Sequence, residues 1–461
     1  MNNLKAYFVP HPPLIVPEIG KGEEQTIKKT IAAYQHVAKE IAVFKPDTIL
    51  FLSPHALTYD DYFHIERGIV NKGDFGAFNA PYLTFENKSD LSFIQQIEDL
   101  AKVRSFHSGT LGRQNNKLDH GVMVPMYFIN QEYKNYEIVR LSFSGLSFLT
   151  HYNYGKLIQE VEINNPNKKY VFVASGDLSH MLKSDGPYGY AEEGPLFDRR
   201  ICEIISSGNF LDLFTLDPVL IEGAGECGFR SLMVLAGLLD KRAVQSKLLS
   251  YEGPFGVGYA VASFDIKDVD ENRNYGVKHE KEEAKRITCL RNDEDPYVAL
   301  ARQSLEHYVQ KGIRLSLDKV NYKLLEERAG VFVSIKKQGM LRGCIGTIRP
   351  TTPSVTEEIV QNAVSSGTED PRFDPVTKSE LAELIYSVDV LKTPEKISSP
   401  NQLDVKKYGV IVRYRGRSGL LLPNLDGVNT IDEQIAIALQ KAGIDKNDPY
   451  SLERFEVIRH H

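Results

Sequence analysis

The chain has 461 residues, of which 42% are hydrophobic and 25% charged, and its net charge is −6 at neutral pH. These values are typical of a globular protein of about two to four domains, and they argue against nucleic acid or an anionic membrane as a partner. The opening residues lack the apolar core of a signal peptide, no stretch is long enough to span a membrane, and the four cysteines are scattered without a CxxC pair, so we expect a cytoplasmic protein.

Residues 4–52 show the pattern of a strand, a helix and a second strand. The runs Ala6–Val9 and Thr48–Leu52 are hydrophobic and predict strands. Thr48–Leu52 is apolar along its whole length, as central strands of a parallel sheet are. Between these runs, apolar residues recur at three- and four-residue steps and predict one buried helical face, made by Ile27, Ile31, Tyr34, Ala38 and Ile41.

Further hydrophobic runs predict that this first domain continues to residue 266. Strands are expected at 138–143, 170–174 and 259–264, and a helix is expected over 230–239. Alternating strands and helices indicate an α/β class. We therefore expect residues 1–266 to form one α/β domain, with a mixed sheet in a sandwich-like arrangement.

The segment 267–286 is rich in charged residues and has very few apolar ones. Such a segment buries too little surface to offset the entropy of ordering it, so we interpret it as a linker, although its last part is also compatible with the solvated start of a helix. Residues 287–461 then form a second domain. A helix near 297–308 and strands at 330–335, 386–390 and 409–414 predict an α+β fold for it.

Four histidines lie in short turns rather than inside periodic elements: His11, His55, His120 and His180. Three of them, His11, His55 and His180, follow predicted strands. The carboxyl ends of parallel strands open into one crevice, so these side chains can converge. Imidazole is the commonest metal ligand and the commonest acid or base near neutral pH. The pattern therefore predicts a metal-centred active site.

Two imidazoles and one carboxylate form the ligand set of non-haem Fe(II) oxygenases. His11 and His55 are the best imidazoles. Glu226 is the first candidate for the carboxylate, because the glycines around it let the backbone approach closely, and Glu222 and Asp177 are its rivals. His120 and His180 would then act as acid/base groups or support the ligands.

The same residues, in order along the chain, resemble the LigB-type class III extradiol ring-cleaving dioxygenases and the related Memo proteins. The resemblance covers residues 4–266 and rests on five separated elements, which are Pro10-His11-Pro12-Pro13, Ser53-Pro54-His55, Asp119-His120-Gly121 with Val124-Pro125, Ser179-His180, and Glu226.

This resemblance implies a metal-dependent dioxygenase that acts with O2 on a catecholic or related aromatic substrate. It implies that His11, His55 and Glu226 hold Fe(II), while His120 and His180 act on substrate and oxygen. In Memo-type relatives a thiol can face the metal instead, and Cys227 stands next to Glu226. A thiolate would favour copper or zinc, Cu or Zn(II), over iron. The alternative function is a Memo-like metal-binding scaffold or regulatory protein without ring cleavage.

The second domain carries the hexapeptide Leu341-Arg342-Gly343-Cys344-Ile345-Gly346. A cysteine between glycines with an arginine nearby is either a thiol of lowered pKa or a small buried residue. With 362–363, 370–373, 387–388 and 419–423, this motif resembles the AMMECR family over about residues 285–461, although the chain has no tryptophan. The family's activity is undefined, and its association with Memo-like and radical-SAM proteins suggests a fusion of two components of one system, with a radical-SAM protein as a possible partner.

Overall fold

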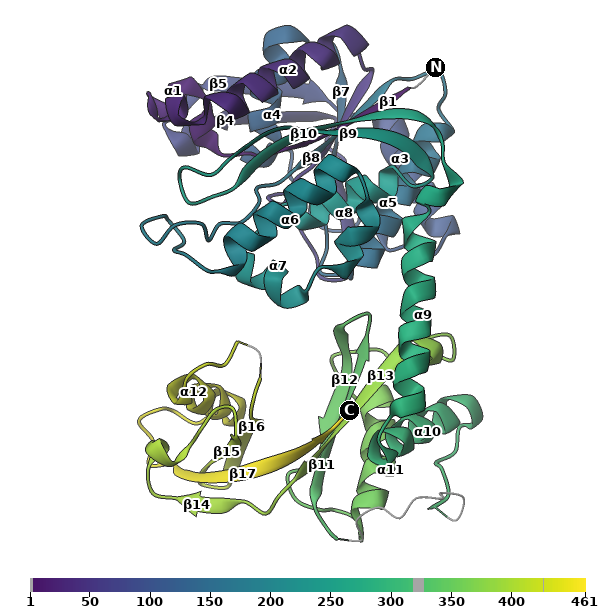
Figure 1. Ribbon diagram of the computed structural model, residues 1–461, viewed down its shortest axis with the longest axis vertical. Helices are drawn as coiled ribbons and strands as arrows, with labels where there is room; N and C mark the ends of the chain where they lie inside the picture. The colour runs from purple at the N-terminus through teal and green to yellow at the C-terminus, as the bar shows by residue number, and fades with distance from the viewer. Residues whose placement is uncertain (1–2, 318–326, 426) are drawn as a thin grey trace. The chain divides into compact units, whose positions relative to one another are not determined.

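The computed structural model describes residues 3–317, 327–425 and 427–461 (Figure 1). The chain divides into two compact units, 1–280 and 281–461. No helix in the described parts of the chain is long and apolar enough to cross a membrane. The two-domain α/β and α+β organisation predicted from the sequence is confirmed.

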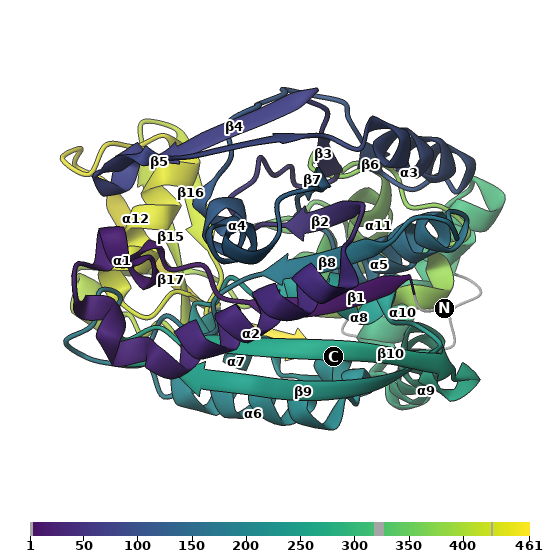
Figure 2. The ribbon, with the colours of Figure 1, turned by 90° about the horizontal axis from the view of Figure 1, so that it is seen from above.

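The first unit is built on an eight-stranded mixed sheet of order β6-β3-β7-β2-β8-β1-β10-β9, which can be followed in Figure 2 from β7 to β9. Its four central strands are parallel, and β10 and β9 extend it in antiparallel fashion. The bounds are β1 Leu4–Val9, β2 Thr48–Leu52, β3 Phe63–Glu66, β6 Ser108–Gly109, β7 Glu137–Leu141, β8 Tyr170–Ser175, β9 Arg242–Glu252 and β10 Tyr259–Val269.

Helices cover both faces of this sheet, as Figure 1 shows. One core packs α3, α5, α6 and α8 against alternate residues of the strands, and a second core packs α2 and α4 against the other face. The helix bounds are α1 Pro17–Gly20, α2 Lys28–Phe44, α3 Leu91–Val103, α4 His120–Glu132, α5 Phe148–Ile163, α6 Glu193–Ser207, α7 Pro218–Ala224 and α8 Phe229–Leu238. A separate hairpin, β4 Val70–Phe75 and β5 Ala80–Lys88, lies outside the main sheet.

The charged segment 267–286 takes up the end of β10, a short 3-10 turn and the first part of α9, Tyr275–Asp293. The buried residues of α9 are Tyr275, Gly276 and Ile287, and the residues between Gly276 and Ile287 are exposed or half-buried. Along this solvated part of the helix, Arg286 pairs with Glu283 one turn earlier, at 2.5 and 2.7 Å. The division between the two units therefore falls inside a solvated helix.

The second unit contains a seven-stranded sheet of order β12-β11-β13-β17-β15-β16, with β14 paired to β17. Helices α10 and α11 pack on one half of this sheet, and α12 packs on the other. The bounds are α10 Pro296–Lys311, β11 Gly330–Lys337, β12 Met340–Gly346, α11 Val355–Thr368, β13 Leu384–Leu391, β14 Glu395–Ile397, β15 Tyr408–Tyr414, β16 Arg417–Leu421, α12 Ile431–Ala442 and β17 Ser451–His460.

Candidate metal centre

The candidate site lies where the central parallel strands end. Strand β8 is flanked by β1 and β2, and its last residues pair with Val9 and Leu52. His11 follows β1 and His55 follows β2, so the register of the sheet carries both imidazoles to one edge. The His11 and His55 rings lie 4.7 Å apart between centroids. The convergence expected from the sequence is present for these two histidines.

The ring nitrogens of this pair face each other. His11 Nε2 and His55 Nε2 are 2.9 Å apart. The His120 ring lies 3.9 Å from that of His55 and 5.4 Å from that of His11, measured between centroids. Each of the three offers one nitrogen, and these atoms lie within 4.8 Å of one another. His11 is buried at 2% exposure, whereas His55 is exposed, so solvent reaches the cluster from one side.

The hydrogen bonds around His11 determine which of its nitrogens carries the proton. Ser175 Oγ donates its single proton to the Gly121 carbonyl at 2.7 Å. It must therefore accept from His11 Nδ1, which lies 2.9 Å away. With the proton on Nδ1, the lone pair of His11 Nε2 is directed at the cluster. A hydrogen-bonded Nδ1 is the usual arrangement behind a metal-ligating Nε2.

Burial keeps these imidazoles neutral. Desolvation lowers the pKa of His11 to about 3 and that of His120 to about 3, and it lowers the pKa of His55 in the same direction. Neutral imidazole is the form that binds metal ions. The pKa shifts of all three imidazoles therefore favour the form that binds a metal ion.

Cys227, rather than Glu226, adjoins the histidines. Cys227 Sγ lies 3.7 Å from His11 Nε2. The Glu226 carboxylate instead accepts a hydrogen bond from the Phe229 N–H at 2.5 Å, at the start of α8, and burial raises its pKa to about 7. The ligand role predicted for Glu226 stays a prediction. The side chain beside His11 is that of Cys227.

Glycines bring the Cys227 turn to this edge of the sheet. A Cβ added to Gly176 would lie 2.2 Å from the Cα of Gly228, so only glycine permits this backbone approach. The loop after β8 and the turn before α8 are consequently in direct contact, and the Asp177 N–H lies 3.3 Å from Cys227 Sγ.

Asp177 is the carboxylate closest to the cluster among the three weighed from the sequence. Its Oδ1 accepts from the His11 N–H at 2.9 Å, and its Oδ2 lies 4.0 Å from His11 Nε2. Burial raises the pKa of Asp177 to about 6. Asp177, His11 and Cys227 form a second possible ligand group, whereas Glu222 is exposed on α7 and belongs to neither group.

His180 lies at the rim of the site rather than in it. Its ring stacks on Tyr188 with 5.0 Å between centroids, and its N–H donates to the Ala224 carbonyl at 3.1 Å. Desolvation lowers the pKa of His180, which favours the neutral form of this imidazole. It is available as a proton acceptor, but it is not grouped with the possible ligands.

His11 is shared by two groups of potential metal ligands in the described residues, His11–His55–His120 and His11–Asp177–Cys227, and neither group contains both His55 and Cys227. Nitrogen and sulfur ligands bind transition-metal ions at about 2.0 to 2.3 Å, which places two donors on one ion about 3 to 4 Å apart. The separations of 2.9 Å between the imidazole nitrogens and 3.7 Å from nitrogen to sulfur are close to that range. Imidazole with thiolate suits Zn, Cu or Fe.

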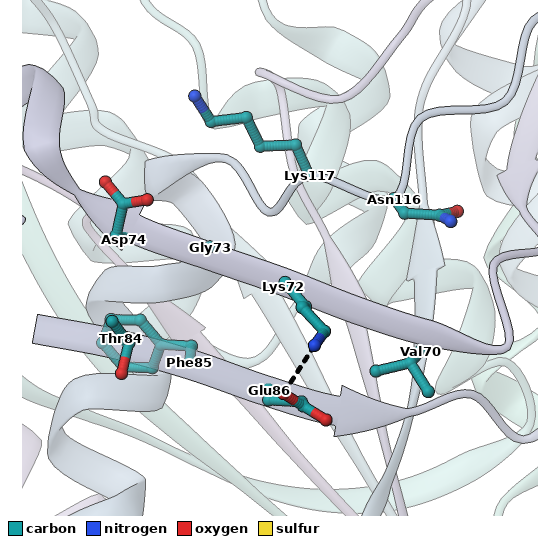
Figure 3. A pocket seen from close by; sticks show the side chains of 9 residues that line it. All are labelled: Val70, Lys72, Gly73, Asp74, Thr84, Phe85, Glu86, Asn116 and Lys117. Atoms are coloured by element: carbon teal, nitrogen blue, oxygen red, sulfur yellow. Dashed lines mark ion pairs between the residues drawn. The ribbon is translucent and has the colours of Figure 1, made fainter.

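A surface groove on the hairpin is separate from this centre. Figure 3 shows it between β4 and β5, where Lys72 and Glu86 form an ion pair at 3.0 Å and Lys117 extends to one side. Its lining shares no residue with the histidine cluster, so the groove adds nothing to the chemistry of the metal centre.

Cys344 in the second unit is fixed by hydrogen bonds to the turn of Asp370 and Arg372. It lies on β12, where its N–H donates to Asp370 at 2.9 Å and its carbonyl accepts from Arg372 at 3.3 Å. The thiol accepts from Ser334 Oγ at 3.2 Å. The hydroxyl of Ser334, and not an imidazole, is therefore the neighbour of this thiol in the described residues, whereas Cys–His catalysis requires a base within reach.

Comparison with known proteins finds two family matches. Residues 5–262 match the catalytic LigB subunit of aromatic ring-opening dioxygenase, and residues 298–460 match AMMECR1. A protein of Clostridium acetobutylicum is 42% identical over 463 residues, which cover 98% of each chain. A protein of Thermotoga maritima is 46% identical over 170 residues, 36% of this chain and 98% of its own. The crystal structure of an uncharacterized protein from Pyrococcus horikoshii is 32% identical and covers 35% of this chain and 88% of that one, with a TM-score of 0.33.

Proposed function

Since this chain belongs to the LigB family over residues 5–262 and carries an AMMECR1 domain over residues 298–460, we propose that its first domain is a mononuclear metal centre. His11, Cys227 and Asp177 would hold the ion, and His55, beside His11, would be a further donor. The observation that supports this most directly is that an imidazole and a thiol from two other turns both approach His11 Nε2, with His55 Nε2 at 2.9 Å and Cys227 Sγ at 3.7 Å from it.

The surroundings of His11 support the same assignment. Ser175 holds the proton on Nδ1, and Asp177 accepts from the backbone N–H, so two hydrogen bonds fix the ring and its turn. A structural role for His11 would need only one hydrogen-bond partner at Nε2, whereas both an imidazole and a thiol lie close to this nitrogen. Two imidazoles and a thiolate favour copper or zinc as the resident ion.

A second candidate function is the oxygen-dependent opening of a catecholic ring, in which Glu226 or Asp177 would supply the carboxylate and the ion would be Fe(II). Two neutral imidazoles beyond the ligand pair, His120 and His180, favour it. A bound Fe(II) ion would supply the oxygen activation that ring opening needs. His120 and His180 would take the protons of the substrate hydroxyl groups, because a neutral imidazole near the site is a suitable general base.

Metal analysis of the whole protein, purified without oxygen, tests the first candidate. We expect about one transition-metal ion per chain, lost when both His11 and His55 are changed to alanine. Full occupancy in that double variant would contradict the centre. Oxygen uptake by the Fe(II)-loaded protein, measured over a series of catechols, tests the second candidate, and yellow ring-opened products would establish it. A loaded site without any uptake would leave metal binding as the function.

A further inference from the structure

We propose that Asp119, supported by the buried guanidinium of Arg140, is the positioning residue of the metal centre. It fixes the two turns that carry His55 and His120. This inference rests on the proposed metal binding, because it concerns how ligands on different elements are kept at one place.

A single oxygen of Asp119 reaches both turns. Asp119 is the N-cap of α4, and its Oδ1 accepts from the Val122 N–H at 3.2 Å, which fixes the first turn of the helix and His120 within it. The same oxygen accepts from Ser53 Oγ at 2.6 Å. Because the one hydroxyl proton of Ser53 is used there, Ser53 Oγ accepts from the His55 N–H at 3.2 Å.

The contact between the two turns has no spare room. A Cβ added to Gly121 would lie 2.3 Å from Ser53 Oγ. The start of α4 therefore lies directly against the end of β2, with glycine at the point of contact. The short distance between the His55 and His120 rings follows from this approach.

The second oxygen of Asp119 is held by charge. Asp119 Oδ2 is buried and has no hydrogen-bond donor among the described residues, and Arg140 Nη2 lies 3.9 Å from it. Arg140 is 3% exposed, on β7 next to β2. The buried carboxylate of Glu66 faces the same guanidinium, so two carboxylates, those of Asp119 and Glu66, stabilise the positive charge of Arg140.

Arg140 also fixes the segment that leads into Asp119. Its Nη1 donates to Asn71 Oδ1 at 3.2 Å and to the Asn115 carbonyl at 2.8 Å. Its Nη2 donates to the Lys117 carbonyl at 2.9 Å. The planar fork of arginine makes these bonds together, and a lysine ammonium cannot reproduce them. The guanidinium thus determines where the chain arrives at Asp119.

The opposite end of β2 supplies a matched control. Asp90 is also a buried N-cap, which accepts from the Phe93 N–H at 3.0 Å and from Thr48 Oγ1 at 2.7 Å. Its counter-charge is Lys168, at 2.9 Å. Asp90 therefore performs the same structural task as Asp119, but at the end of β2 away from the histidines.

Titration of the full chain with Co(II), followed by the visible absorption of the bound ion, tests the proposal. We expect Asp119→Ala to weaken Co(II) binding by about 10- to 100-fold, the usual effect of removing a group that orients ligands, and to change the spectrum. Asp119→Asn keeps the acceptor of the cap but removes the charge that faces Arg140, so its affinity should lie between those of Asp119→Ala and the wild-type chain. Arg140→Lys should weaken binding while the charge is kept, and Asp90→Ala should lower the melting temperature without changing the Kd.

Wild-type affinity and spectrum in folded Asp119→Ala would overturn the positioning role. So would equal losses of affinity in Asp119→Ala and Asp90→Ala, since the effect would then be one of stability alone. If Asp119→Ala does not fold, Ser53→Ala decides, because it breaks the link to His55 and leaves the cap; unchanged affinity there also overturns the role. Absence of Co(II) binding to the wild-type chain would instead contradict the metal centre itself.

Discussion

His11 is the residue around which the proposed centre is organised. It is buried at 2% exposure, and its two ring nitrogens have separate partners, Ser175 on one side and the cluster on the other. The burial that lowers its pKa also makes the neutral ring the stable form. One residue thus combines the protonation state and the orientation that a metal ligand needs.

The pH dependence of metal binding should report the thiol rather than the imidazoles. Burial raises the pKa of the Cys227 thiol well above its usual value, so binding as thiolate must release a proton. Burial lowers the pKa of His11 to about 3, so its imidazole releases no proton in this range. We expect the affinity for Zn(II) to rise about tenfold per pH unit between pH 6 and pH 8, as one proton is released per ion.

Competition titrations against a zinc-binding dye at several pH values would measure this slope. Cys227→Ala should bind more weakly and show a slope near zero. A steep slope that persists in Cys227→Ala would identify a different proton source and contradict thiolate ligation.

At the scale of elements, the edge of the sheet was predictable and the orientation of a single turn was not. The runs that become β1, β2 and β8 are hydrophobic throughout, and parallel strands carry His11 and His55 to the same edge whatever the details of packing. Whether Glu226 or Cys227 faces that edge depends on a one-residue difference in the turn before α8. The free N–H groups at the start of the helix bind the Glu226 carboxylate, a local contact between residues three apart that leaves no hydrophobic pattern.

That Asp119 and Ser175 support the site could not be read from the sequence either. Asp119 precedes His120, and an Asp at that place is a recognisable helix cap. Its second partner, Ser53, comes from another strand, and hydrogen bonds between distant segments leave no periodic signal. The charged composition of 267–286 left a linker and the solvated start of a helix both open, because a solvated helix needs little apolar surface; the structure has α9 from Tyr275.

A methyl group between the loop after β8 and the turn before α8 should release the metal. We expect Gly176→Ala to reduce zinc affinity and stability together, because its Cβ would clash with the backbone of Gly228 at 2.2 Å. Gly343→Ala is the control in the second unit, where the Cβ would lie 2.0 Å from the Ser366 carbonyl oxygen. It should lower stability and leave zinc binding intact. Equal loss of zinc in both variants would contradict the local explanation.

At the scale of the whole molecule, the proposed metal ligands all belong to one of the two units. Every proposed ligand precedes residue 280, and Cys344 with its Asp370–Arg372 turn lies in the second unit. The two units meet in sequence within the solvated part of α9. All the residues of the proposed metal centre therefore lie in the first unit.

Limited proteolysis of the metal-loaded chain should consequently cut within the solvated stretch of α9 and leave all the metal with the N-terminal product. Metal content of the separated products by mass spectrometry checks this expectation. Cys344→Ser should leave the metal content of the intact chain unchanged. Loss of the ion from the N-terminal product, or dependence on Cys344, would show that the second unit contributes ligands.

The most direct test of the centre compares metal content in two single variants of adjacent residues. Cys227→Ala should reduce the bound metal from about one ion per chain to a small fraction, because a structural ligand is lost. Glu226→Gln keeps an acceptor for the Phe229 N–H and should retain the ion. If Glu226→Gln loses the metal while Cys227→Ala keeps it, the carboxylate is the third ligand, and the thiol-containing centre proposed for this chain is wrong.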